Sequence, residues 1–210
     1  MSYLKSFIIR ETGHQTMSSL FLDTLSGQQS EKRPIWLMRQ AGRYLAEYQA
    51  VRASEPDFIS LCLNPEKAVK VTLQPIERFG FDAAIIFSDI LMVPWALNRN
   101  VRFVVGEGPK LDPMETGGEI TEAMIADMTP KLTPVARAIS SCRAALAADK
   151  ALIGFAGAPW TIITYLLEGG SSRDFAKARQ WLWGNDARFD RLIDLVSLAT
   201  ADFLTLQAEA

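Results

Sequence analysis

Histidine and cysteine are scarce in this chain of 210 residues. The single histidine, His14, excludes a histidine-based catalytic triad and a histidine-rich metal site. The two cysteines, Cys62 and Cys142, fit neither a zinc motif nor a redox pair, and each lies in an apolar pattern typical of a helix. They are therefore predicted to be buried structural thiols. Any chemistry must use arginine, aspartate, tyrosine and backbone groups.

Long apolar runs are missing too. None reaches the roughly 18 residues of a membrane span, and the apolar piece at residues 7–9 is too short for a signal peptide. Glu11 and the shortage of arginine disfavour a mitochondrial presequence. Residues 1–17 are predicted to be a flexible N-terminal tail, with Met17 as a candidate natural start, and a cytoplasmic location without membrane contact is expected.

The chain also lacks a strong excess of charge, since its formal net charge is −2. A content of 49% hydrophobic and 22% charged residues is ordinary for a globular domain. Residues 31–52 are locally basic, because this range holds five basic side chains and only two acidic ones. A mildly acidic protein with a local basic patch suits a small anionic ligand rather than nucleic acid.

Two arginines four residues apart form the most informative motif. The run Arg39-Gln40-Ala41-Gly42-Arg43 follows a short apolar segment, Ile35–Met38. A guanidinium binds a carboxylate with two parallel hydrogen bonds and keeps its charge at any physiological pH. The spacing therefore predicts a carboxylate receptor. The alternative is a strand end whose arginines are merely solvated.

Apolar periodicity predicts an α/β fold with alternating strands and helices. Strands are expected at Ile35–Met38, Phe81–Phe87 and Ala151–Ala156, with a short extra strand at Val101–Val105. Helices are expected at Leu20–Leu25, Tyr44–Arg52, Pro65–Phe79 with a kink at Pro75, Pro130–Ala148, around Tyr165, from Ser171 or Ser172 through Trp183, and at Ala187–Ala208. Such an order is typical of a parallel sheet built from βαβ units.

Ligands of parallel sheets bind at the carboxyl ends of the strands. The arginine motif follows the first predicted strand, Asp89 follows the second, and Gly157 and Tyr165 follow the third. These positions are the candidate site. Each has a structural alternative, because Asp89 can cap a helix, Tyr165 can be a core aromatic and Gly157 can serve a turn.

Three segments, residues 33–48, 79–94 and 153–169, closely resemble the uroporphyrinogen decarboxylases, and the likeness runs from about Leu20 to the last residue. It implies a (β/α)₈ barrel, a homodimer, and cofactor- and metal-free removal of carbon dioxide from the four acetates of uroporphyrinogen, a polyanionic tetrapyrrole, giving coproporphyrinogen. By resemblance, Asp89 and Arg39 are catalytic. The substrate-binding residues so implied are Arg39, Gln40, Ala41, Gly42, Arg43, Asp89 and Tyr165. Ala46 replaces the family's usual proline, which is expected to loosen the next helix.

The sequence holds only about the first three of the eight strand–helix units that such a barrel needs. Residues 18–210 are therefore predicted to be the N-terminal part of a single barrel domain, poorly soluble or partly molten alone, and inactive. The alternative function is non-catalytic binding of a porphyrinogen or another organic anion. A methyltransferase relative, with zinc held by His and Cys, is a third possibility that the Arg39–Arg43 motif disfavours.

Overall fold

The computed structural model describes residues 19–115, 119–184 and 187–210. The predicted tail at 1–17 and His14 lie outside these ranges. The helices are α1 (Leu20–Leu25), α2 (Ala46–Ala53), α3 (Phe58–Cys62), α4 (Pro65–Phe79), α5 (Met92–Ala96), α6 (Glu122–Ala126), α7 (Met128–Ala145), α8 (Pro159–Glu168), α9 (Ala176–Trp183) and α10 (Ala187–Ala208). The strands are β1 (Ala83–Ile85), β2 (Arg102–Val104), β3 (Gly108–Lys110) and β4 (Ala151–Ile153).

The long helices form where the sequence predicts them. In α4, the Asn64 side chain accepts a hydrogen bond from the Lys67 N–H at 3.2 Å, and Gly80 ends the helix with a φ of 68°. The helix runs unbroken through Pro75. Because caps at both ends fix its limits, α4 matches the prediction to the residue.

Other helix limits differ from the prediction. Helix α2 begins at Ala46, two residues late, at the first helical position where proline is favoured. The predicted start of α9 at Ser171 or Ser172 is also wrong. The Ser172 hydroxyl does not cap it directly but accepts a hydrogen bond from the Phe175 N–H, and the helix begins one residue later. The short helices α3, α5 and α6 were not expected.

Strands β1 and β4 pair in parallel, with Ala83 opposite Ala151 and Ile85 opposite Ile153. Both lie inside predicted strands but are shorter. Strands β2 and β3 form a separate antiparallel hairpin around Gly106, which confirms the extra strand and adds a partner for it.

The strand predicted at Ile35–Met38 is wrong. This segment is bonded at Ile35 to Asp82, the residue before β1: the Asp82 N–H donates to the Ile35 carbonyl at 3.0 Å, and the Asp82 carboxylate accepts from the Ile35 N–H at 2.8 Å. Pro34 has no N–H with which to extend a ladder. A single backbone bond and the side chains of Asp82 and Gln40 therefore hold the segment beside β1 in place of strand pairing.

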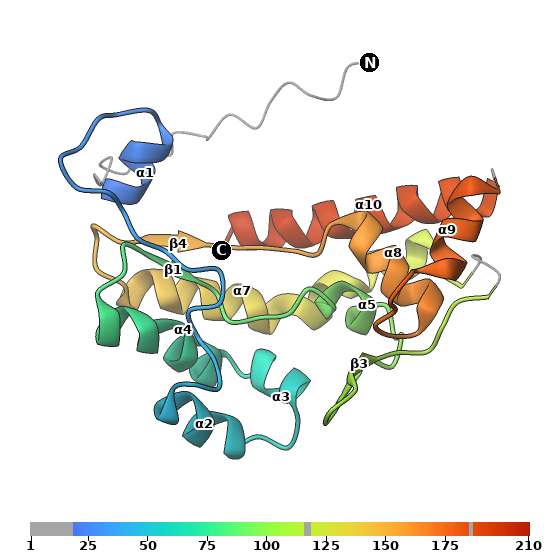
Figure 1. Ribbon diagram of the computed structural model, residues 1–210, viewed down its shortest axis with the longest axis horizontal. Helices are drawn as coiled ribbons and strands as arrows, with labels where there is room; N and C mark the ends of the chain where they lie inside the picture. The colour runs from blue at the N-terminus through green and yellow to red at the C-terminus, as the bar shows by residue number, and fades with distance from the viewer. Residues whose placement is uncertain (1–18, 116–118, 185–186) are drawn as a thin grey trace.

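The helices pack around one main apolar core. Helix α4 packs against α7, α7 against α10, and α10 against α8, as Figure 1 shows. Cys62 and Cys142 lie in this core as free, buried thiols, as predicted, and burial raises the pKa of Cys142 to about 11. A second, small cluster lies under α2 and consists of Leu45, Tyr48, Val51, Leu61 and Val71. Phe87 contacts both clusters and joins them.

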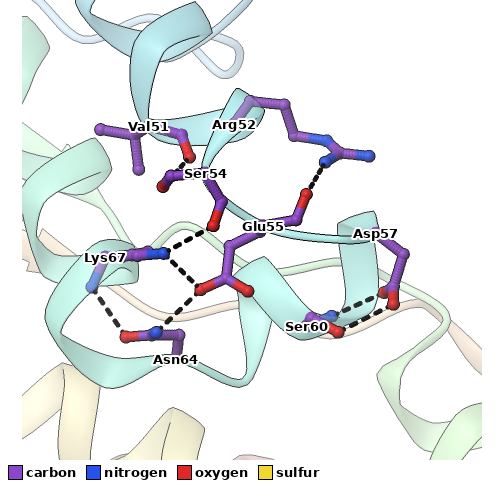
Figure 2. A network of polar contacts seen from close by, with 8 residues as sticks. All are labelled: Val51, Arg52, Ser54, Glu55, Asp57, Ser60, Asn64 and Lys67. Carbon is purple, nitrogen blue, oxygen red and sulfur yellow. Dashed lines mark hydrogen bonds and ion pairs between the residues drawn. The ribbon is translucent and has the colours of Figure 1, made fainter.

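A polar network fixes the connection between α2 and α4, which includes α3 (Figure 2). The Lys67 ammonium lies 2.8 Å from the Glu55 carboxylate and donates to the Ser54 carbonyl at 3.0 Å, and the Asn64 amide donates to Glu55 at 2.8 Å. The hydrogen bond from Lys67 lowers the pKa of Glu55. The network ties the segment that follows the arginine motif to the cap of α4.

In the described ranges, no helix is both long and apolar enough to cross a membrane.

Candidate functional site

The arginine loop, residues 38–43, lies beside β1, to which Gln40 is bonded, and leads along the chain into α2. Arg39 and Arg43 are both exposed. Neither guanidinium has a hydrogen bond or an ion pair with any residue that the structure describes. Two unpaired guanidiniums on one short loop have the charge and the hydrogen-bond donors that suit carboxylates, so their predicted role as a carboxylate receptor stays a prediction.

The middle of the loop is buried and anchored. The Gln40 amide donates to the Ala83 carbonyl at 3.1 Å, and its oxygen accepts from the Leu37 N–H at 3.4 Å. The Tyr44 hydroxyl donates to the Gln40 carbonyl. Ala41 packs against the small cluster under α2, whereas Gly42 has room beside the Tyr44 ring. The two exposed arginines therefore lie on either side of an anchored residue, Gln40.

Asp89 lies on the segment that follows β1, as predicted. Its carboxylate accepts a hydrogen bond from the Leu91 N–H at 2.8 Å, so it also caps the turn into α5. Burial raises the pKa of Asp89, while the Leu91 hydrogen bond and the positive charge of Arg39 oppose the rise. The charge of Arg39 therefore acts on Asp89, although no hydrogen bond or ion pair joins these two predicted site residues in the described ranges.

Thr72 on α4 holds the segment that carries Asp89. Its hydroxyl accepts from the Phe87 N–H at 2.9 Å and donates to the Ala68 carbonyl at 2.7 Å. The next residue, Ser88, has a buried hydroxyl without a hydrogen-bond partner in the part of the chain that is described. Unpartnered buried polar atoms occur where a ligand, water or further chain completes the bonding.

Gly157, after β4, touches the Asp89 segment directly. A Cβ at Gly157 would lie 3.0 Å from the Ile90 carbonyl oxygen and 3.1 Å from the Ile90 Cβ. The residue therefore does more than serve a turn, because its lack of a side chain lets two strand-end segments meet.

Tyr165 lies on α8, half-buried against the main core. It lines a hollow of about 310 Å³ together with Trp160, Thr161, Thr164, Ser171, Ser172 and Phe175. Within the described ranges, no hydrogen bond links Tyr165 to Arg39 or Asp89. Its role at the site stays a prediction.

Sequence reasoning missed two residues that anchor backbone segments next to β1 and β4, and of these only Thr72 holds the segment that carries Asp89. Thr72 holds the end of β1, and Gln207 on α10 bonds both the N–H and the carbonyl of Phe155 at 3.0 Å. The only available signal was a polar residue on the apolar face of a helix, which many core positions share. No group of three or more His, Cys, Asp or Glu residues suited to a metal ion is found among the described residues.

Comparisons with known proteins identify the family. The family model described as "Uroporphyrinogen decarboxylase (URO-D)" matches residues 16–210. Curated uroporphyrinogen decarboxylases from Rhodospirillum rubrum and Caulobacter vibrioides are 47% and 50% identical over 190 residues. Each alignment covers 90% of this chain and 55% or 54% of the relative, respectively. The chain therefore spans about half the length of the curated relatives that it matches.

A solved structure supports the fold. A methyltransferase from Methanosarcina mazei superposes with a TM-score of 0.73 over 93% of this chain and 56% of its own, at 19% identity. The parallel β1–β4 pair with its covering helices is part of a (β/α)₈ barrel, which confirms the predicted fold class. With a family model matched over nearly its whole length and relatives close to 50% identical, the chain belongs to the uroporphyrinogen decarboxylase family.

Proposed function

We propose that this chain is the N-terminal part of one barrel domain that decarboxylates the four acetate side chains of uroporphyrinogen III to give coproporphyrinogen III. The reaction uses no cofactor, and the whole protein acts as a cytoplasmic homodimer. The observation that carries the proposal is a pair of unpaired guanidiniums on the arginine loop, of which Arg39 acts electrostatically on Asp89, a half-buried carboxylate on the segment after β1.

Carboxylate recognition falls to Arg39 and Arg43. A uroporphyrinogen carries eight carboxylates around a flexible macrocycle, so guanidiniums on a fixed loop orient one acetate while holding others. Bidentate pairing supplies direction as well as attraction.

The electron sink is the substrate's own pyrrole ring. Protonation of a ring carbon makes an iminium cation, and the C–C bond to the carboxylate then breaks with its electron pair moving into the ring. A proton adds to the resulting methylene and the ring proton leaves, so that CH₂COO⁻ and one proton become CH₃ and CO₂. Asp89 accepts hydrogen bonds from the pyrrole N–H groups and stabilises the cation where it develops.

The proton comes from the region of Asp89. A guanidinium pKa above about 12 suits general acid catalysis poorly near neutrality, which argues against Arg39 as the donor. The raised pKa of Asp89 makes its protonated form more accessible than that of an ordinary aspartate. Protonated Asp89, or water bound to it, is the donor that this environment favours.

The activity is tested on a completed protein, which we define as this chain joined after Ala210 to the remaining C-terminal part of the Caulobacter vibrioides relative. Uroporphyrinogen III is incubated anaerobically, and the products are separated by their number of carboxylates. We expect turnover by the completed protein and none by this chain alone. Asp89→Asn should abolish turnover but preserve binding, while Asp112→Asn, an exposed aspartate, should behave as the unsubstituted protein.

Two outcomes would contradict the proposal. Unchanged turnover in Asp89→Asn would remove Asp89 from the mechanism. A folded completed protein that binds but does not convert the substrate would favour the second candidate, a non-catalytic binder of porphyrinogens or organic anions. That candidate is kept because the chain spans only about half of its relatives.

A further inference from the structure

Gln40 differs from the other residues of the arginine loop in its surroundings. Gln40 is only 1% exposed, whereas Arg39 and Arg43 are exposed. A buried amide is stable only when its polar atoms are hydrogen-bonded. Both ends of this amide are bonded, to Ala83 and to Leu37.

The two bonds bridge segments that are distant in sequence. The Gln40 nitrogen donates to a carbonyl of β1, and its oxygen accepts from a backbone N–H of the extended segment before the loop. One donor and one acceptor, pointing to two neighbouring backbones, is the pattern of a peptide group in a sheet. The side chain therefore supplies the pairing that the segment 35–38 does not make itself.

We propose that Gln40 is a positioning residue whose amide stands in for a peptide group between the arginine loop and β1, and so fixes Arg39 relative to Asp89. The inference rests on the carboxylate binding proposed above. With its amide bonded and buried, Gln40 acts through Arg39 rather than by contact with substrate.

The location of the bridge makes this effect direct. Gln40 follows Arg39 in sequence, and Ala83 begins the strand whose far end leads to Asp89. A displacement of about 1 Å at a binding group is enough to cost a large part of a rate. The charge of Arg39 already acts on Asp89, so a shift of the loop changes the distance between the two functional groups.

Gln207 provides a matched control. It is also a buried glutamine, 7% exposed, and its amide also makes two backbone bonds, both to Phe155 at 3.0 Å. It lies on α10 and has no bond to the arginine loop. Loss of its amide removes comparable hydrogen bonds without releasing Arg39.

The first test measures binding of uroporphyrin, a fluorescent octacarboxylate, to this chain and to the completed protein. Gln40→Met and Gln40→Glu should each weaken binding about tenfold, since the glutamate carboxylate cannot donate to the Ala83 carbonyl. Gln207→Met should leave the Kd within about twofold. On the completed protein, the Gln40 variants should raise KM for uroporphyrinogen more than they lower kcat.

A double-mutant cycle asks whether the effect passes through Arg39. In an Arg39→Met background, Gln40→Met should cause no further loss of binding. An equal loss in both backgrounds, or an equal loss in Gln207→Met, would overturn the proposal.

Hydrogen exchange at the Leu37 amide tests the bridge without a ligand. Gln40→Met should speed exchange there, and an unchanged rate would overturn the proposal. Binding without turnover in the unsubstituted completed protein would refute the decarboxylase function but leave this inference intact. No uroporphyrin binding by any form would refute both.

Discussion

The pKa of the Asp89 carboxyl group is subject to opposing effects. Burial raises its pKa, and the Leu91 hydrogen bond and the Arg39 charge compensate only in part. A carboxyl with a raised folded-state pKa contributes stability that is complete below its unfolded pKa of about 3.9. That contribution is lost as the pH rises through the folded-state pKa. At neutral pH the ionised Asp89 therefore costs the fold stability.

Replacement by asparagine should reverse this cost. In Asp89→Asn the side-chain oxygen still accepts from the Leu91 N–H, but no charge is buried. We expect the completed protein to melt at a higher temperature than the unsubstituted form at pH 7, with the difference vanishing toward about pH 3. Circular dichroism melts across this pH range measure it. A lower melting temperature at pH 7, or a difference independent of pH, would show that burial does not disfavour the charge.

The sequence identifies the charged residues of the site better than the buried ones. Arg39 and Asp89 stand out because each follows an apolar run where a buried core would not place a charge. The two buried anchors do not stand out. In the sequence, Gln40 is one more polar residue of the motif, and Thr72 is a β-branched residue on one face of a helix. Their partners, Ala83 and Phe87, are 43 and 15 residues away, respectively.

At the scale of elements, local signals decide what can be predicted. Helix α4 follows from its Asn64 cap and Gly80 stop, both of which act within a few residues. The failed strand at Ile35–Met38 has a suitable apolar pattern, yet pairing depends on a neighbour that the pattern does not describe. Instead of a neighbouring strand, the Asp82 carboxylate and the Gln40 amide oxygen accept the hydrogen bonds of the Ile35 and Leu37 N–H groups.

The contact between two strand-end segments at Gly157 yields a prediction at this scale. In Gly157→Ala the new methyl group would lie 3.0 Å from the Ile90 carbonyl oxygen and from the Ile162 Cγ1. Overpacking of this kind costs about 1–3 kcal/mol, so the melting temperature should fall by roughly 2–4 °C per kcal/mol. Turnover should fall further than stability explains, because Ile90 adjoins Asp89.

Gly42→Ala is the matched control for the steric cost. Its added Cβ would lie 3.6 Å from the Tyr44 ring, an ordinary contact, so the melting temperature should hardly change. If Gly157→Ala were as stable as Gly42→Ala, the close approach of the two segments would not be needed in solution.

At the scale of the whole molecule, the parallel pair β1–β4 is short of neighbours. Parallel sheets are normally covered on both faces and continued at their edges. Here the edge of β1 is held by the arginine loop and its preceding segment, and Gln207 bonds Phe155 just beyond β4. In that preceding segment, Ile35, Leu37 and Met38 are 57%, 52% and 72% exposed.

This exposure predicts how the chain alone and the completed protein differ. Exposed apolar groups beside an unpaired sheet edge favour association and binding of hydrophobic dyes. We expect this chain alone to bind anilinonaphthalene sulfonate, to exchange the β4 amides rapidly and to release no carbon dioxide. The completed protein should suppress dye binding and slow the exchange, because further strands and helices cover the same surfaces. A 210-residue chain that is monomeric, binds no dye and exchanges as slowly as the completed protein would show that these elements already form a self-sufficient fold.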